Sequence, residues 1–573
     1  MENTEELPFR ISSTVKALSS ALRGEPGTVA EAGSLYGGGR GASEPEKLWF
    51  KESSAKNLRN RDFLSPTTVL TTLFADGQVP PHVMDRVLSA GGSGVLPIAG
   101  GEVIGEGLRL RVDHAVTFRD VLCGTSRYIQ PSCKQQGGVV LNCPALYPRP
   151  SLLTPDTLTL GQLRTVLLAD HLGALLQRQG YSISRCPVLP EDCEIVVFLK
   201  LLGVDWPTVS VGSNNVEREE ELWQALQNSP YREEEEEAER GKSRGEEQET
   251  ETNERRGDGK VAVKINLKRV LEKNRLQGYD PNLGTYTVQR DSVSQLAQLQ
   301  KAVMGFQVPV AAVVHVTSCQ DEFRQQQMAM LWRAGGATFT QKHLVCGPVK
   351  TPGSQLSATQ YIQLRRVQMK EASEMKYGAH VEGQAWDDII KVMTSATVRF
   401  ELLSTAHTSP VTLDVQREGG VSTKGPRGGV FVMYNCARLH TLFNSYERAV
   451  EQGLYPKIPD GSQLDFSALK EEGEWLLLFN YLIPFSELLD QSGQALEQGG
   501  EGARVSLRTE QVCRFLVSLS KDFSSYYNRV HVLGEPMPHL FNQMFCRLQL
   551  LSALRELYHY ALDTLHIPPI PQL

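Results

Sequence analysis

The chain of 573 residues is 40% hydrophobic and 22% charged, which is ordinary for a globular protein and too long for one core, so we expect roughly two to four domains. A formal net charge of −7 excludes a uniformly basic nucleic-acid binder, so any basic surface has to be local. The ten cysteines form no Cys-x-x-Cys pair, which predicts neither a zinc framework nor another metal site and, with no membrane-length apolar run, favours a cytoplasmic protein without a membrane partner.

The first part of the chain, residues 1–125, is predicted to form an N-terminal α/β domain. Residues 7–22 carry apolar side chains at helical spacing. The glycine-rich segment 37–41 lacks the Lys-Ser/Thr pair of a phosphate-binding loop, and we predict that it is a linker. Four further glycines are predicted to form turns between strands: Gly100, Gly101, Gly105 and Gly107.

The central part, residues 126–385, has the pattern of a parallel α/β domain. A short β-type run at 138–142 precedes a helical pattern at 161–180 and another strand. The same order recurs where an apolar strand at 309–315 precedes a helix at 322–335. Strand, loop, helix and strand in succession indicate a parallel α/β unit.

An acidic low-complexity run interrupts this central part. Residues 231–259 contain twelve acidic and six basic side chains, a balance of −6, and cannot bury enough apolar surface to fold. We therefore predict a disordered acidic insert at 214–259. Two interpretations of the insert stay open: a solvated insertion without further role, and a tunable site for a partner.

A basic stretch follows the second helix of the central part. It holds five cations against two acids: Lys350, Arg365, Arg366, Lys370 and Lys376 against Glu371 and Glu374. A solvated helix face and a phosphate-contacting face explain this composition equally well.

The last part of the chain, residues 386–573, is predicted to be all-α. Helical periodicity covers 389–402, 432–450 and 510–529, and a final pattern begins at Phe541. That final pattern runs over about six turns and is ended by prolines, which lack the amide donor that a helix needs. Spacing alone indicates an amphipathic bundle helix with a solvated face.

Three sets of residues in these helices carry a family resemblance. The first helix contains Tyr434, Ala437 and Arg438 as a Tyr-x-x-Ala-Arg motif. The other two helices carry the remaining positions: Leu519, Phe523 and Tyr526, then Arg547, Leu548, Leu562, Leu565, Ile567 and Pro568 or Pro569. Together they resemble the DALR anticodon-binding domain that closes arginyl-tRNA synthetases. The resemblance implies an α/β fold, in which a degenerate class I synthetase (Rossmann-like) core is followed by an all-α DALR anticodon-binding bundle.

Both catalytic signatures of that family are eroded in this sequence. In the family, a His-x-Gly-His loop stabilises the phosphates of ATP through its histidines. The equivalent place in this sequence resembles that loop in its glycine alone and reads Thr159, Leu160, Gly161 and Gln162. Neutral Thr and Gln cannot supply a cation to developing phosphate charge. The segment equivalent to the Lys-Met-Ser-Lys loop, residues 353–359, contains no lysine. We therefore predict no catalytic residues, no cofactor and no adenylation.

The candidate RNA-binding residues lie on the first and last of the three helices. Arginine contacts phosphate and stacks on bases, Asn, Thr and Ser hydrogen-bond base edges, and an aromatic ring stacks on unpaired bases. The candidates are Tyr434, Asn435, Arg438, His440, Thr441, Ser445, Arg448, Arg547, Arg555 and His559. Residues 431–573 contain eleven Lys/Arg and sixteen Asp/Glu, a balance of −5, so any contact with RNA has to be local.

The resemblance implies a non-catalytic relative of arginyl-tRNA synthetase that works as a tRNA-binding adapter. Its implied partners are arginine tRNAs and a methyltransferase that makes 3-methylcytidine in the anticodon loop. Two alternatives remain: a protein–protein scaffold without RNA binding, and a residual arginine-tRNA ligase.

Overall fold

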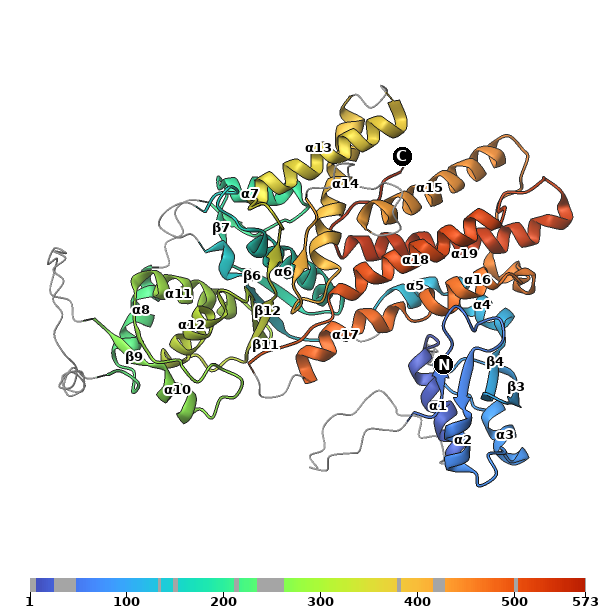
Figure 1. Ribbon diagram of the computed structural model, residues 1–573, viewed down its shortest axis with the longest axis horizontal. Coiled ribbons are helices and arrows are strands. Elements are labelled where there is room, and N and C mark those ends of the chain that lie inside the picture. The colour runs from blue at the N-terminus through green and yellow to red at the C-terminus, as the bar shows by residue number, and fades with distance from the viewer. Residues whose placement is uncertain are drawn as a thin grey trace.

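The computed structural model describes residues 7–24, 48–131, 135–147, 153–210, 216–233, 262–378, 383–415, 428–498 and 503–571. The predicted linker at 37–41 and most of the predicted acidic insert lie outside these residues. Figure 1 shows the N-terminal unit at one end, the α/β core at the other, and a set of long helices beside both. The expected order of an α/β core followed by a helical bundle is confirmed.

An antiparallel sheet with the strand order β1-β2-β4-β3 organises the N-terminal unit. Its strands are β1 (Lys51–Glu52), β2 (Phe63–Pro66), β3 (Ile98–Ile104) and β4 (Gly107–Val112). Its helices are α1 (Ile11–Arg23), α2 (Thr67–Leu73), α3 (Pro81–Leu88), α4 (His114–Cys123) and α5 (Thr125–Ile129). The prediction of turns at Gly100 and Gly101 was wrong, because both lie inside β3.

A four-stranded parallel sheet with the order β12-β11-β5-β6 forms the centre of the core. The strands are β5 (Gly138–Asn142), β6 (Ser182–Cys186), β11 (Val310–Ser318) and β12 (Gln341–Cys346). The helices that belong to this sheet are α6 (Leu160–Arg178), α11 (Arg290–Met304) and α12 (Glu322–Ala334). All five residues of β5 are buried, as expected for an inner strand of a parallel sheet covered on both faces.

Smaller elements surround the core sheet. They are β7 (Leu189–Pro190), α7 (Glu194–Leu201), β8 (Thr208–Val209), α8 (Val216–Gln227), β9 (Lys264–Asn266), α10 (Leu267–Lys273), β10 (Thr285–Thr287), β13 (Val349–Lys350) and β14 (Val411–Thr412). Helix α8 corrects the predicted start of the acidic insert. Its charged sequence carries Leu222 and Leu226 one turn apart, and both leucines are buried in the core, which gives this segment the apolar contact that folding requires.

The helical part of the chain is built from α13 (Ala358–Tyr377), α14 (Gln384–Leu403), α15 (Gly429–Glu451), α16 (Glu472–Leu477), α17 (Phe485–Gln498), α18 (Glu510–Arg529) and α19 (Phe541–Asp563). A short π-helical stretch, Leu478–Leu482, follows α16. Figure 1 shows α13 and α14 side by side and α15 next to α14, in agreement with their contacts.

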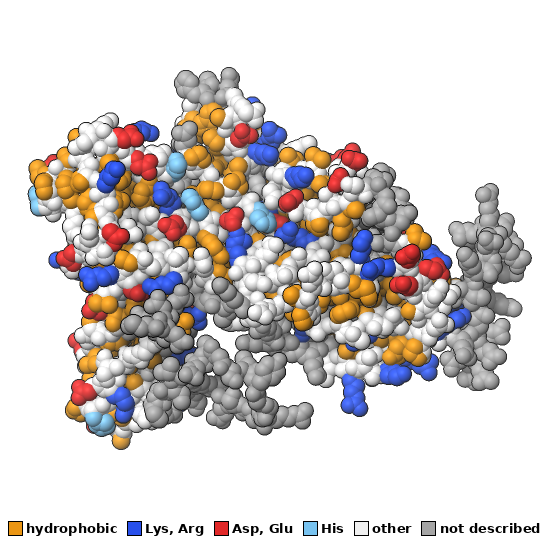
Figure 2. All heavy atoms as spheres, turned by 180° about the vertical axis from the view of Figure 1, so that it is seen from behind, with side chains coloured by type: hydrophobic (Ala, Val, Ile, Leu, Met, Phe, Trp, Pro, Cys, Tyr) orange, Lys and Arg blue, Asp and Glu red, His pale blue; other side chains and the backbone are white. Residues whose placement is uncertain are grey.

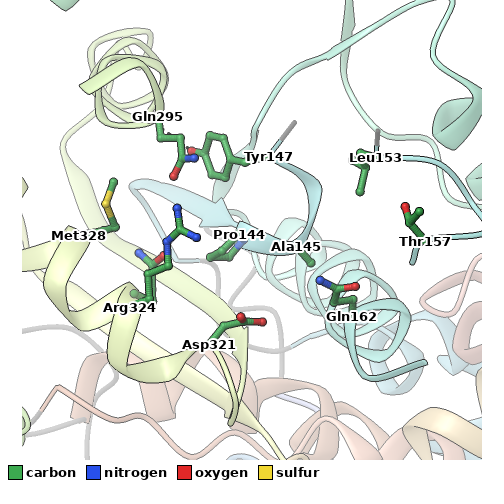
Figure 3. A pocket seen from close by; sticks show the side chains of 11 residues that line it. Pro144, Ala145, Tyr147, Leu153, Thr157, Gln162, Gln295, Asp321, Arg324 and Met328 are labelled. Carbon is green, nitrogen blue, oxygen red and sulfur yellow. Dashed lines mark hydrogen bonds between the residues drawn. The ribbon is translucent and has the colours of Figure 1, made fainter. Parts of the chain in front are cut away.

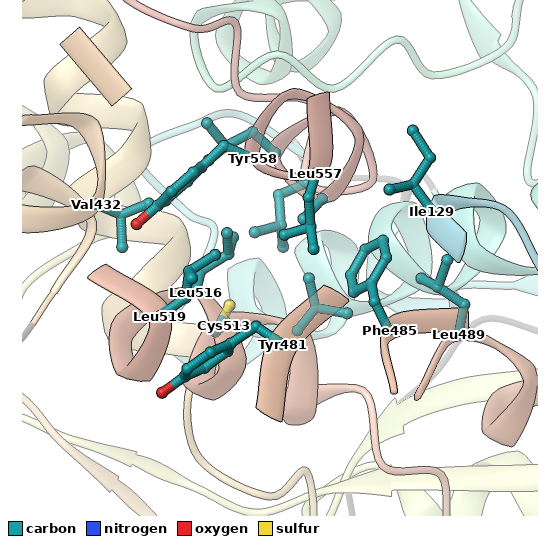
Figure 4. Close-up of a cluster of buried hydrophobic side chains, with 14 of the residues drawn as sticks. Ile129, Val432, Tyr481, Phe485, Leu489, Cys513, Leu516, Leu519, Leu557 and Tyr558 are labelled. Carbon is teal, nitrogen blue, oxygen red and sulfur yellow. The ribbon is translucent and has the colours of Figure 1, made fainter. Parts of the chain in front are cut away.

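Helix α19 is the central helix of this bundle. Its regularly spaced apolar residues, including Met544, Leu548, Leu551, Leu554 and Tyr558, are buried, and so are Leu550 and Leu557 on its other sides, while Glu556 is exposed. The predicted solvated face is narrow and contains Glu556 and Asp563, because neighbouring helices cover most of the helix. Figure 4 shows Leu557 and Tyr558 of α19 among apolar side chains of α15, α17 and α18. Replacing one such leucine by alanine typically costs about 2–5 kcal/mol.

Buried polar contacts join the core to the helical part. Arg164 on α6 is fully buried, and its guanidinium donates to five backbone carbonyls, those of Gly347, Leu402, Thr405, Ala406 and Ser409. Asp170 on the same helix accepts hydrogen bonds from Arg399 at 2.9 Å and contacts His566 at 2.8 Å. The segment that follows α19, which includes the buried Ile567 and Ile570, therefore contacts α6 through His566 and through the Thr564 carbonyl, 2.7 Å from His171 Nδ1.

Candidate nucleic-acid interface

The helix ends that correspond to the two eroded signatures lie next to each other. Thr159 precedes α6 and Ser357 precedes α13, and the two residues form an isolated antiparallel bridge. The backbone N–H of Ala358 donates to the Leu158 carbonyl at 2.9 Å. The loops that the sequence assigned to separate motifs therefore meet in one place.

Each of these helix ends is closed by its own side chains. The amide N–H of Gln162 donates to Thr159 Oγ1 at 3.2 Å, and the Gln162 side chain accepts from the Thr159 N–H at 3.0 Å. Ser357 and Gln360 repeat this reciprocal arrangement at 3.3 and 3.0 Å. Such a capping box satisfies backbone donors that a phosphate would otherwise contact. Thr159 and Gln162, which were predicted to stand in place of the family's histidines, thus stabilise the N-terminal end of α6.

A pocket of about 270 Å³ lies beside these helix ends, at the carboxyl ends of β5 and β11. This is the place in a parallel sheet where ligands usually bind. Figure 3 shows Asp321, which precedes α12, and Arg324 of α12 on one side and Gln162 on the other. Among the described residues that line the pocket, the charged ones are Asp321 and Arg324, whose charges have opposite sign. The pocket therefore lacks the excess of cations that a synthetase needs to stabilise phosphate charge.

Sequence reasoning missed a group of buried histidines below this pocket. Nδ1 of His315 lies 2.9 Å from the Asn142 amide and 3.0 Å from the Gln325 amide, and its Nε2 lies 3.0 Å from Gln341 Oε1. Burial lowers the pKa of His315 to about 4 and that of His343 well below its ordinary value. Neutral imidazoles add no positive charge to the pocket. No group of three or more His, Cys, Asp or Glu side chains in the described ranges is arranged to hold a metal ion.

The helical part presents a different kind of surface, a groove of about 410 Å³ between α15 and the end of α18. Three of the candidate residues, Arg438, Thr441 and Ser445, line it at successive turns of α15. Tyr527, Asn528 and His531 line the opposite side. Helical spacing brings the first three together, since residues three and four apart share one face.

Arg438 is the central group of this groove. Its guanidinium donates to Ser524 Oγ at 3.2 Å and to Asn528 Oδ1 at 3.0 Å. The guanidinium carbon also lies 5.1 Å from the Tyr434 ring centre and 4.9 Å from that of Tyr527. Within the described residues its partners are neutral, so its positive charge is not cancelled by a carboxylate.

The other groove residues keep hydrogen-bonding capacity at the surface. The Thr441 hydroxyl donates to the Ala437 carbonyl at 3.0 Å, and the Ser445 hydroxyl donates to the Thr441 carbonyl at 2.9 Å. Each hydroxyl oxygen can still accept a bond from a ligand. Arg448 is exposed one turn further along the same side of α15.

Asn435 and Arg547 serve the interior instead of the surface. Asn435 is fully buried, and its amide donates to the Phe431 carbonyl at 2.8 Å. Arg547 is paired with the buried Glu474 at 2.7 Å, although burial still raises the pKa of that carboxyl. Both residues are therefore removed from the set of direct RNA contacts, because Asn435 is buried and the Arg547 guanidinium is already paired with Glu474.

The last three candidates lie between α15 and α19, on a different side from the groove. The Arg555 guanidinium carbon stacks 4.1 Å from the Phe443 ring centre. Burial, with the nearby charges of Arg555 and His440, lowers the pKa of His559. The structure therefore separates His440, Arg555 and His559 from Arg438, Thr441 and Ser445.

Charges of both signs are interspersed over the face of the molecule that Figure 2 shows. This distribution agrees with the net charge of −7, and it makes the groove around Arg438 a local feature. Among the residues that the structure describes, no helix combines the length and the apolar character needed to cross a membrane.

Comparison with known proteins places these features in a family. Residues 9–128 match the DALR N-terminal domain, and residues 432–573 match the DALR anticodon binding domain. DALR anticodon-binding domain-containing protein 3 of Danio rerio is 67% identical over 99% of this chain and 100% of its own length. The chain belongs to this family. The Mus musculus member is 41% identical over 92% of this chain and 96% of its own length.

The fold of this chain is also similar to that of a synthetase. Thermus thermophilus arginyl-tRNA synthetase matches the structure with a TM-score of 0.58 at 15% identity, covering 98% of this chain and all of that one. This DALR protein is therefore an anticodon-binding-domain protein related in fold to arginyl-tRNA synthetase. All ten candidate residues lie within the matched anticodon-binding segment.

Proposed function

We propose that this DALR protein binds tRNA through the groove between α15 and α18. The observation that carries the proposal is the Arg438 guanidinium, which lies between two tyrosine rings, without a carboxylate partner among the described residues, in the segment matched to an anticodon-binding domain. An arginine in this setting contacts phosphate and stacks on unpaired bases. The contacts in this proposal are Tyr434, Arg438, Thr441, Ser445 and Arg448.

We further propose that the tRNAs are arginine tRNAs and that the protein acts as a cytoplasmic, non-catalytic adapter. Its relation to arginyl-tRNA synthetase supports the choice of tRNA. The closed capping boxes at Thr159 and Ser357 support the absence of adenylation, because the groups at both signature loops are engaged with the fold. In this proposal the adapter presents the anticodon loop to a methyltransferase that forms 3-methylcytidine.

The primary test measures the affinity of the purified full chain for arginine tRNAs and for other tRNAs at a fixed salt concentration, since phosphate contacts depend strongly on salt. We expect tighter binding of arginine tRNAs. Equal affinity for all tRNAs would remove arginine recognition from the proposal, and no binding to any would remove tRNA binding.

The adapter role is tested separately with a purified 3-methylcytidine methyltransferase. We expect methylation of arginine tRNA to depend on this protein and to fall when Arg438→Gln replaces the wild type. Methylation that proceeds equally well without the protein would contradict the adapter role. ATP–pyrophosphate exchange that depends on arginine and tRNA would contradict the absence of catalysis.

A further inference from the structure

Six side chains from four helices form a continuous row of rings and cations beside the groove. We name this row the cation–aromatic ladder; in order, it consists of Trp386, Tyr377, Lys376, Tyr434, Arg438 and Tyr527. Helices α13 and α14 supply the first three members, and these lie outside the segment matched to the anticodon binding domain. The row therefore connects the end of the core with the helical part.

The distances along the ladder are those of direct ring and cation contacts. The rings of Trp386 and Tyr377 are 5.3 Å apart, and Lys376 Nζ lies 4.7 Å from the ring centres of both Tyr377 and Tyr434. Arg438 continues the row between Tyr434 and Tyr527. A cation within about 6 Å of a ring centre is attracted by the ring, so each neighbour holds the next in place.

The cations of the ladder keep their charge available to a ligand. Lys376 is exposed, and within the described ranges neither Lys376 nor Arg438 forms an ion pair with a carboxylate. Lys370, six residues earlier on α13, is instead paired with Glu374 at 3.8 Å. In the basic stretch, Lys370 is thus paired with a carboxylate, whereas Lys376 contacts two aromatic rings.

Resting on the proposed function, we infer that the ladder extends the RNA-binding face onto α13 and α14 and binds unpaired bases and adjacent phosphates of an RNA loop. Aromatic rings offer stacking faces to bases, and cations between them match the phosphates that join successive bases. A duplex hides its base faces within the stack, so the ladder favours looped over paired RNA. Its last members, Arg438 and Tyr527, lead directly into the groove.

The test uses the full chain, an RNA hairpin with an unpaired loop, and a blunt RNA duplex of the same length. Lys376→Gln removes one cation, and Lys370→Gln on the same helix is its matched control. Tyr377→Leu removes a ring but keeps apolar bulk, and Tyr377→Phe keeps the ring. We expect Lys376→Gln and Tyr377→Leu to weaken hairpin binding by at least about fivefold, the lower end for loss of one stacking contact. Neither control is expected to change it.

Fluorescence gives a second readout that a purely structural ladder would not change. The chain has six tryptophans, and the difference between wild type and Trp386→Phe isolates the signal of Trp386. We expect the hairpin, and not the duplex, to quench this signal because a stacked base contacts the ladder. Thermal unfolding of each variant identifies any loss of folding.

The outcomes separate this inference from the function on which it rests. Hairpin binding that is lost in Arg438→Gln but unchanged in Lys376→Gln and Tyr377→Leu would overturn the ladder and leave the groove standing. Equal losses in Lys376→Gln and Lys370→Gln, or equal affinity for hairpin and duplex, would also overturn it. A wild-type protein that binds neither tRNA nor hairpin would overturn both.

Discussion

The two helix ends at Thr159 and Ser357 and the groove around Arg438 use polar residues in opposite ways. At the helix ends, side chains satisfy the backbone of their own helices, and the pocket beside them holds one guanidinium and one carboxylate among its described lining residues. In the groove, Arg438 has neutral partners and aromatic neighbours. The comparison teaches that the residue type alone does not mark a binding site; what matters is whether the fold has already used its charge.

The largest effect is expected when an arginine that stabilises the fold, Arg164, is removed. Arg164→Ala removes a fully buried guanidinium that donates to five backbone carbonyls, and we expect the free energy of unfolding to fall by about 3–5 kcal/mol. Denaturant unfolding measures the change. Arg324→Ala, at the exposed edge of the pocket, is the control and should lie within about 0.5 kcal/mol of wild type.

Buried histidines make the stability of the core depend on pH. His171 and His315 have pKa values of about 4 because burial disfavours the imidazolium, whereas the unfolded chain binds these protons near the ordinary value of 6.5. The contribution of these neutral histidines to the free energy of unfolding is therefore fully present above pH 6.5. It falls as the pH drops toward 4, by up to about 3 kcal/mol for each histidine.

Unfolding measured across that pH range checks this dependence. His315→Gln should flatten the profile, although it lowers stability at neutral pH by disturbing the bonds to Asn142 and Gln341. A profile of unchanged slope would show that other groups cause the acid sensitivity.

The groove is tested by the reverse experiment, in which stability should hold and binding should change. Arg438→Gln removes a charge with neutral partners, so we expect tRNA affinity to fall about tenfold with unfolding nearly unchanged. Filter binding at several salt concentrations gives the affinity and the salt slope. A large loss of stability with unchanged tRNA affinity would show that Arg438, like Arg164, stabilises the fold and does not bind RNA.

The smallest expected effect concerns the capping boxes. Thr159→Ala removes the acceptor for the Gln162 N–H, and we expect a loss of about 1 kcal/mol in stability, with tRNA affinity unchanged. Ser357→Ala should behave alike, because its geometry is nearly the same. Reduced tRNA affinity in these variants, with folding preserved, would indicate that the helix ends contact RNA after all.

Long periodic segments were the most predictable part of this fold. The bounds of α18 agree with the predicted 510–529, and α15 and the strands β5 and β11 lie close to their predicted positions. Apolar spacing determines such elements locally. Helix α8 was missed because its acidic composition obscured Leu222 and Leu226, whose burial depends on the core they contact.

The candidate site was less accessible to sequence reasoning, for a geometric reason. Helical spacing grouped Arg438, Thr441 and Ser445, but it did not reveal that Asn435 points inward or that Arg547 meets Glu474. The ladder joins Tyr377 and Trp386 to α15 across long stretches of chain, and only tertiary packing brings such residues together. The sequence signal for the ladder was the basic stretch that ends at Lys376. Its composition fitted a solvated helix face and a phosphate-contacting face equally well.

The bond between Asp170 and His566 has a consequence for how the molecule assembles. Its two residues are 396 positions apart, and Asp170 sits on the helix that covers the central sheet. During synthesis, that carboxylate stays without its imidazole neighbour until nearly 400 further residues have been made. The buried contacts of the core are therefore complete only when the segment after α19 is in place.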